Sequence, residues 1–136
     1  MRDSKTLIRL RIVPCGLFEP VSHTMTLVRL ADSYRLNVVE RNGISKKQRR
    51  WRVDLVASEV DSRLAALRQT TVPAFPVSPM VCDGEYIEMT VEGDYSTLAL
   101  GWWTIAPEGA EVFAEFSDWI REAGLGNEDE SENDES

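Results

Sequence analysis

Seven consecutive residues combine five cations with an indole ring. They read Lys46-Lys47-Gln48-Arg49-Arg50-Trp51-Arg52. Cationic side chains bind phosphates, and an aromatic ring stacks on a nucleic-acid base. The segment therefore predicts a nucleic-acid-binding site formed by Lys46, Lys47, Arg49, Arg50, Trp51 and Arg52. The same charges also suit a solvated loop, or an edge strand that they protect against aggregation.

A second group of charged residues recurs near the C-terminus at intervals of three and four. Its members are Glu108, Glu111, Glu115, Asp118 and Glu122. At about 100° per residue, these carboxylates would form one ridge on a helix, beside its apolar stripe. Like charges at these spacings repel one another, so the ridge is unfavourable in an isolated helix. Within this segment only Arg121 relieves the repulsion.

Glu88 and Glu92 form a smaller acidic strip, because they alternate with apolar residues and would share one face of a strand. Together with the ridge, they would form an anionic docking surface, although an ordinary solvated face has the same composition. Trp102 and Trp103 would point to opposite faces of the next strand, which makes Trp103 a candidate interface anchor. The predicted partner-binding residues are Glu88, Glu92, Trp103, Glu108, Glu111, Glu115, Asp118 and Glu122.

No pattern predicts catalysis or a cofactor. His23 is the single histidine, and we expect a solvated loop histidine rather than a general base. Cys15 and Cys82 have no histidine pair nearby, so we expect two reduced thiols, and whether they approach each other stays open. Motifs for phosphate-binding loops, zinc and calcium are absent from the sequence. We therefore expect a non-enzymatic protein with no catalytic residue, no metal and no cofactor.

The charges divide unequally between the two halves of the chain. Residues 1–68 hold fourteen of the fifteen Lys and Arg against seven acids, a net +7, whereas residues 69–136 hold sixteen acids against one base, a net −15. Such asymmetry bears on partners and solubility rather than on fold.

The length and a hydrophobic fraction of 43% predict one domain, residues 1–125, followed by an acidic tail, residues 126–136. Residues 127–136 contain six acids and no apolar side chain, so we expect the tail to be disordered and able to contact the basic segment. The apolar stretch that begins at Leu7 is interrupted by arginines and ends at Pro14, too early to span a membrane. We expect a cytoplasmic protein without membrane contact.

The periodicity of hydrophobic residues predicts the elements that position these groups. Alternation with a period of two predicts strands at 6–13, 25–30, 34–41, 50–56, 86–92 and 98–102. Asn42-Gly43 suits a tight reversal with positive φ. Ser58 and Asp61 resemble a capping box at the start of a first helix.

A second helix would begin in the first turn at Pro107 and close at Gly124 in a left-handed conformation. Runs of antiparallel strands with two helices predict an α+β fold, in which an antiparallel sheet of about five or six strands is covered on one face.

The C-terminal part of the domain resembles a group of small bacterial proteins. The resemblance follows Asp83-Gly84, Tyr86, the Gly93-Asp94 hairpin, Trp102-Trp103, Pro107 and the Trp119 helix, over about the last 45 residues. These proteins belong to toxin-immunity and uncharacterised families, and the resemblance implies a compact, acidic, non-enzymatic α+β domain that neutralises a toxin by binding it. The basic segment and the acidic tail depart from the pattern.

The first functional expectation is therefore an immunity-type inhibitor whose acidic surface engages a basic protein partner. A nucleic-acid or nucleoprotein accessory domain acting through residues 46–52 is the first alternative. A structural subunit with its contact at Trp102-Trp103 is the second. The oligomeric state stays open.

Overall fold

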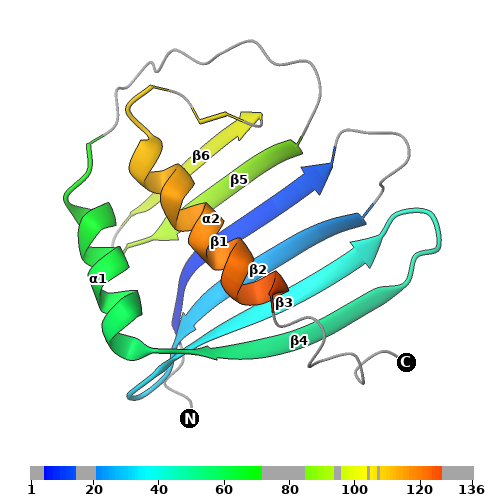
Figure 1. The fold of residues 1–136 in the computed structure, drawn as a ribbon, viewed down its shortest axis with the longest axis horizontal. Helices are drawn as coiled ribbons and strands as arrows, with labels where there is room; N and C mark the ends of the chain where they lie inside the picture. The colour runs from blue at the N-terminus through cyan, green and yellow to red at the C-terminus, as the bar shows by residue number, and fades with distance from the viewer. Residues whose placement is uncertain are drawn as a thin grey trace.

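The protein forms one antiparallel sheet with both helices on the same face (Figure 1). The computed structural model describes residues 5–14, 21–71, 85–93, 96–103, 105–106 and 108–126. The strands are β1 (Lys5–Pro14), β2 (Val21–Arg29), β3 (Tyr34–Asn42), β4 (Gln48–Leu55), β5 (Glu85–Glu92) and β6 (Thr97–Trp103). Their order across the sheet is β4-β3-β2-β1-β5-β6. The predicted α+β class, with an antiparallel sheet of five or six strands and two helices, is confirmed.

Alternation along each strand gives the sheet two unlike faces. Leu10 of β1 pairs with Met25 of β2 and Met89 of β5, and all three side chains are buried. The intervening positions, including Arg9 and Arg11, are exposed. Residues i and i+2 of a strand share a face, so the apolar rows of neighbouring strands align into one core layer.

Helix α1 (Ala57–Arg68) covers part of this layer with its apolar face. Val60, Leu64 and Leu67 are its buried residues. The residue before the helix is Val56, which makes no side-chain cap hydrogen bond, so the predicted capping box at Ser58 is wrong. The helix is held by the burial of its apolar face rather than by a polar cap.

Helix α2 (Glu111–Leu125) crosses the centre of the sheet and buries Phe113, Phe116 and Ile120. Gly124 lies inside this helix and is buried against β2 and β3. A Cβ there would lie 3.2 Å from side-chain atoms of Leu36, Met25 and Val38. The prediction that Gly124 closes the helix in a left-handed conformation is therefore wrong, because its small size serves close packing. Gly126 is the C-terminal cap and has a right-handed φ of −67°.

The turn between β3 and β4 also differs from the prediction at Asn42-Gly43. It is longer than a two-residue reversal, and the positive φ of 65° belongs to Lys46. The Asn42 carboxamide oxygen accepts hydrogen bonds from the backbone N–H groups of Ile44 and Ser45, both at 2.9 Å. The asparagine therefore stabilises the turn through its side chain.

Several predictions lie outside the described residues. They concern Cys15, Cys82, the proline-rich connection within 72–84, and the acidic tail after Gly126. The predicted start of the second helix at Pro107 is wrong, because α2 begins at Glu111 and residues 108–110 are not helical. In the described parts of the chain, neither helix has the length and apolar character needed to cross a membrane.

Candidate functional site

The face of the sheet opposite the helices carries a group of arginines. They come from the three strands β1, β3 and β4, and occupy the positions that alternate with the core. The group, here called the arginine face, consists of Arg9, Arg11, Arg35, Arg41, Arg50 and Arg52.

Strand register arranges four of these arginines in two parallel rows. One row runs from Arg11 through Thr24 and Val39 to Arg50. The next runs from Arg9 through Thr26 and Asn37 to Arg52. Neighbouring strands lie about 4.8 Å apart and residues i and i+2 about 7 Å apart, so the four arginines mark the corners of a patch of roughly 14 by 7 Å.

Three small polar side chains and the side chain of Val39 lie between the arginine corners. Thr24, Thr26 and Asn37 lie on β2 and β3 between the two arginine pairs. Their hydroxyl and amide groups donate and accept hydrogen bonds. The patch is therefore suited to a ligand that carries several anionic groups and further polar atoms.

Most of the arginine charge is uncompensated. Arg11 lies 3.5 Å from Glu88 Oε1, and Arg35 lies 3.5 Å from Asp54 Oδ1. Both pairs are largely exposed, so each contributes little to stability. Among the described residues, Arg9, Arg50 and Arg52 have no carboxylate within ion-pair distance.

An aromatic pair lies on the same face at the β5–β6 side. The rings of Tyr86 and Trp103 are 4.9 Å apart with an interplanar angle of 53°, and Trp103 is 43% exposed. Gly101 makes this arrangement possible, because a Cβ at this position would collide with the Tyr86 hydroxyl. Glycine inside a strand often marks such a close approach.

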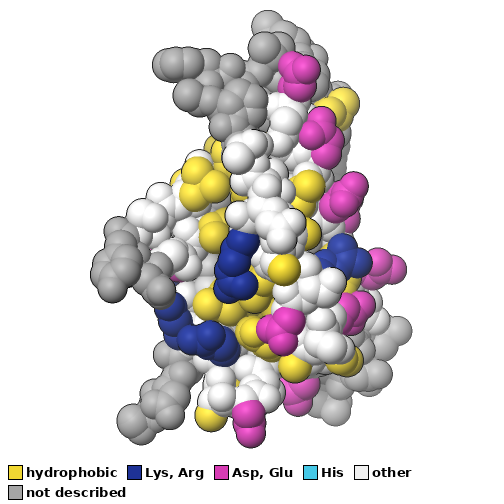
Figure 2. All heavy atoms as spheres, turned by 90° about the vertical axis from the view of Figure 1, so that its left-hand side faces the viewer, with side chains coloured by type: hydrophobic (Ala, Val, Ile, Leu, Met, Phe, Trp, Pro, Cys, Tyr) yellow, Lys and Arg dark blue, Asp and Glu magenta, His cyan; other side chains and the backbone are white. Residues whose placement is uncertain are grey.

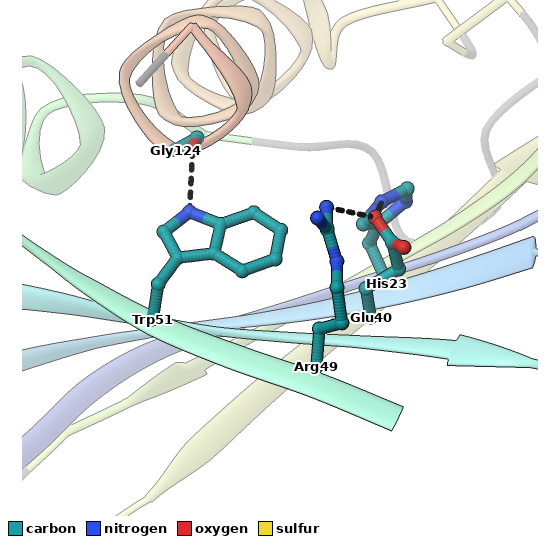
Figure 3. A network of polar contacts seen from close by, with 5 residues as sticks. All are labelled: His23, Glu40, Arg49, Trp51 and Gly124. Atoms are coloured by element: carbon teal, nitrogen blue, oxygen red, sulfur yellow. Dashed lines mark hydrogen bonds and ion pairs between the residues drawn. The ribbon is translucent and has the colours of Figure 1, made fainter. Parts of the chain in front are cut away.

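The structure divides the predicted nucleic-acid-binding segment between the two faces of the sheet. Arg50 and Arg52 point to the arginine face, whereas Trp51 is buried beneath α2 and donates a hydrogen bond from Nε1 to the Gly124 carbonyl oxygen at 2.9 Å (Figure 3). The Arg49 guanidinium lies 5.0 Å from the Trp51 ring centroid. Lys46 and Lys47 are exposed in the turn. Because Trp51 is buried, its ring has no face to stack on a base.

His23 belongs to a polar network and not to a solvated loop, so that prediction is wrong. It lies in β2, and its Nε2 is 3.2 Å from Glu40 Oε1, which also accepts from Arg49 Nη2 at 3.2 Å (Figure 3). The three side chains are partly buried on the helix-covered face. The network joins β2, β3 and β4, which gives it a structural role.

The predicted acidic ridge is exposed along one side of the molecule. Glu111, Glu115, Asp118 and Glu122 lie in α2, and Glu108 precedes it. Figure 2 is turned so that the helix layer of Figure 1 is on its right-hand side, and Asp and Glu side chains are spread along that side. In the part of the chain that the structure describes, none of the five has an ion-pair partner. Arg121 does not relieve them, because its guanidinium makes two hydrogen bonds to Glu85, at 2.9 and 2.8 Å.

The structure does not bring Glu88 and Glu92 together with this ridge. Both alternate with the core residues Ile87 and Met89, so they lie on the arginine face. Glu88 pairs with Arg11, and Glu92 accepts a hydrogen bond from the Thr97 hydroxyl at 3.1 Å. The sheet therefore separates the two acidic groups, and Trp103 lies with Glu88 and Glu92 rather than with α2.

Sequence reasoning missed part of the arginine face. The sequence pattern assigns no binding role to Arg9, Arg11, Arg35 or Arg41. The available signal was alternation, because Arg9, Arg11 and Arg35 each lie one position from a core residue in their strand. The strand order places β1 three positions from β4 in the sheet, so the arginines of the two strands lie on one patch. This order cannot be read from the spacing of residues in the sequence.

Metal ligation has no support in the described ranges, since they contain no group of three or more His, Cys, Asp or Glu residues able to hold an ion. A scan of protein-family models and a search of curated proteins return no match to this chain. The arrangement of its own residues is therefore the basis for a functional interpretation.

Proposed function

We propose that this protein is a non-enzymatic binding protein that holds single-stranded nucleic acid on its arginine face. The single observation that carries the proposal is the pair of arginine rows on an uncovered sheet, with Arg9, Arg50 and Arg52 free of carboxylate partners among the described residues. Guanidinium groups bind phosphates through two parallel hydrogen bonds, so four such groups suit a polyanion.

The aromatic pair favours a nucleic acid over other polyanions. Tyr86 and the exposed Trp103 offer ring surfaces on the same face as the arginines. Stacking of a base on an aromatic ring contributes about 1–3 kcal/mol and needs an unpaired base. An acidic protein would neutralise the arginines but would supply no bases to stack on these rings.

The net charge of the face also favours binding of an anion. Among the described residues, six arginines share this face with three carboxylates, those of Asp54, Glu88 and Glu92. Two of these acids lie on β5, beside the aromatic pair and at the edge of the arginine rows. We infer that the phosphates lie over β1–β4 and that a base reaches Trp103.

Fluorescence anisotropy with labelled oligouridylate and oligothymidylate tests the proposal. If four arginines each displace a counterion from a single strand, the logarithm of the binding constant falls with the logarithm of salt concentration with a slope of roughly 3. The variant R50Q/R52Q removes two of these contacts and should reduce the slope by about 1.4. The matched control R63Q/R68Q removes two charges from α1 and should leave the slope unchanged.

Removal of residues 127–136 extends the same experiment. The six acids of this segment would compete with phosphates for the arginine face. The shortened protein should therefore bind more tightly at low salt, and the difference should decrease as salt screens the charges. Absence of oligonucleotide binding by both proteins would overturn the proposal.

A second candidate function is inhibition of a basic protein, as expected of an immunity-type protein. The observation that favours it is the exposure of Glu108, Glu111, Glu115, Asp118 and Glu122 without cationic partners among the described residues. Such a ridge would accelerate association with a basic surface, and the acceleration would decrease with salt.

This candidate has its own test with a small basic ribonuclease as the probe. Charge reversal of Glu111, Glu115 and Asp118 should weaken binding if the ridge is the site, whereas R50Q/R52Q should not. If the reversal leaves the affinity unchanged, the ridge is not the docking surface. A structural-subunit role would require contact through Trp103, since Trp102 is only 3% exposed.

A further inference from the structure

A cavity of about 370 Å³ opens at the end of the core where α1 ends and α2 begins. Its size lies near the lower limit for ligand pockets in proteins, which occupy roughly 300–1,000 Å³. Described residues of β1, β2, β5, β6 and both helices line it, so it belongs to the framework of the fold. It lies where the end of α1 meets the strand ends. Figure 2 looks onto the left-hand side of Figure 1, where α1 lies, and shows hydrophobic side chains beside Lys and Arg side chains.

Several lining residues of the cavity are apolar. Leu64 and Leu67 of α1, Leu7 of β1 and Phe113 of α2 line it. Leu7, at 9%, and Leu64 and Leu67, both at 7%, are the most exposed residues of the core. The remaining exposure of the core is therefore concentrated at this cavity, and Leu98, 42% exposed, extends the apolar surface to its mouth.

The register of β1 helps to explain why the core is incomplete here. A bulge between Thr6 and Ile8 interrupts the pairing with β2, and the consecutive side chains of Leu7 and Ile8 are both buried. A bulge places an extra residue in one strand and bends it. The cavity forms beside this bend.

The rim of the cavity is cationic. Arg29 at the end of β2 and Arg68 at the end of α1 both line it, and neither has a carboxylate within ion-pair distance in the described ranges. Glu92 is also a lining residue, but its side chain projects to the arginine face, where its carboxylate accepts a hydrogen bond from the Thr97 hydroxyl. The nearby carboxylate of Asp61 accepts a hydrogen bond from the Tyr34 hydroxyl.

Both guanidinium groups also act on the pKa of Tyr34, whose hydroxyl bonds to Asp61. The hydrogen bond to Asp61 raises this pKa most, and burial raises it further. Arg29 and Arg68 both act in the opposite direction on the same hydroxyl. Both cations therefore lie near enough to the Tyr34 hydroxyl to lower its pKa.

We propose that this cavity binds an unbranched aliphatic carboxylate of medium chain length, with its chain in the apolar chamber and its carboxylate between Arg29 and Arg68. A guanidinium forms two parallel hydrogen bonds with a carboxylate, and burial of each methylene group contributes about 0.8 kcal/mol. The site is on the helix side of the sheet, so it is independent of oligonucleotide binding on the arginine face.

Isothermal titration calorimetry of the full chain with decanoate tests this proposal. The decanoate concentration must stay below the value at which decanoate forms micelles. Decanoate should bind with one site per chain. Acetate, which lacks the chain, should show no binding, and decanol, which lacks the charge, should bind at least about tenfold more weakly. Equal binding of decanol and decanoate, or no binding of decanoate, would overturn the proposal.

Two variants locate the ligand. R29Q/R68Q should weaken decanoate binding at least about tenfold, whereas the matched R50Q/R52Q should leave it unchanged. Leu98→Trp at the exposed mouth should also weaken binding, because the larger ring narrows the entrance. A decanoate affinity that is unchanged in both R29Q/R68Q and Leu98→Trp would place the ligand elsewhere and refute this site.

Discussion

Both faces of β4 carry arginines, but these arginines have different surroundings. On the helix-covered face, Arg49 lies against the Trp51 ring, whose N–H group is bonded to the end of α2. On the other face, Arg50 and Arg52 project without carboxylate partners among the described residues. The comparison shows that neighbouring residues with similar chemistry serve stability or recognition according to the face on which strand alternation places them.

The same contrast applies to the whole sheet. The helix side exposes the uncompensated acids of α2, and the open side exposes uncompensated arginines. Opposite charges on opposite faces cannot neutralise each other by contact. The acidic ridge of α2 and the arginine face are therefore suited to partners of opposite charge, and the variants below test how far these two surfaces differ.

Replacement of the two kinds of tryptophan should give the largest difference. Trp51→Ala removes a buried ring and its hydrogen bond to Gly124, so it should lower the free energy of unfolding by about 3–5 kcal/mol. Trp103→Ala removes an exposed ring that contacts Tyr86, and should cost about 1 kcal/mol or less. Urea unfolding measures both, and equal losses would contradict the assignment of the two faces.

The arginine rows should control oligonucleotide affinity. R50Q/R52Q should weaken binding of oligouridylate on the order of tenfold or more at low salt, since each charge-assisted hydrogen bond contributes about 1.5–3 kcal/mol before solvent screening. Its free energy of unfolding should change little, because both side chains are exposed. Anisotropy titrations beside R63Q/R68Q would show whether the loss is specific to this face.

Gly101 provides a way to change the aromatic pair without removing a ring. Gly101→Val should displace Tyr86, because the new side chain would occupy the position of its hydroxyl group. We expect a loss of oligonucleotide affinity of roughly 1 kcal/mol, the lower end of one stacked base. An unchanged affinity together with a changed tyrosine environment in NMR spectra would exclude the aromatic pair from the binding site.

Glu88 distinguishes the two candidate functions by the sign of its effect. Glu88→Gln releases Arg11 from its ion pair and removes a negative charge from the arginine face. Oligonucleotide affinity should rise about two- to threefold, as expected for an exposed pair worth less than about 1 kcal/mol. If Glu88 instead belongs to a docking surface for a basic protein, the variant should weaken binding of the basic ribonuclease.

The smallest expected effect is a change in stability at high pH. The pKa of Tyr34 is raised above the ordinary 10.0, first by its hydrogen bond to Asp61 and then by burial. A group with a raised pKa contributes its full stability below the unfolded pKa, and that stability is lost as pH rises through the folded pKa. Wild type should therefore lose stability above about pH 10 relative to Tyr34→Phe, as measured by urea unfolding of both proteins from pH 8 to 11.

The fold was largely predictable because its signals are local. Alternation identified all six strands, and the apolar stripe containing Phe113, Phe116 and Ile120 identified α2. Gly124 was misinterpreted because a helix-ending glycine and a glycine that permits close packing look alike in sequence. Only the contacts with Leu36, Met25 and Val38 distinguish them.

The candidate site was less predictable because it depends on strand order. Consecutive basic residues suggested one site at residues 46–52, but alternation sends Arg49 and Trp51 to the core. The missing half of the site, Arg9 and Arg11, lies about forty residues earlier in the chain and joins Arg50 and Arg52 only through the register of β1–β4. The same topology separates Glu88 from the acids of α2.

The most direct test of the account is a map of NMR chemical-shift changes during titration with a uridine-rich oligonucleotide. Binding on the open face predicts changes at Arg9, Thr24, Asn37, Arg52 and Trp103, with little change at the exposed positions of α2. Changes concentrated on α2, or no saturable change anywhere, would contradict the proposed role of the arginine face.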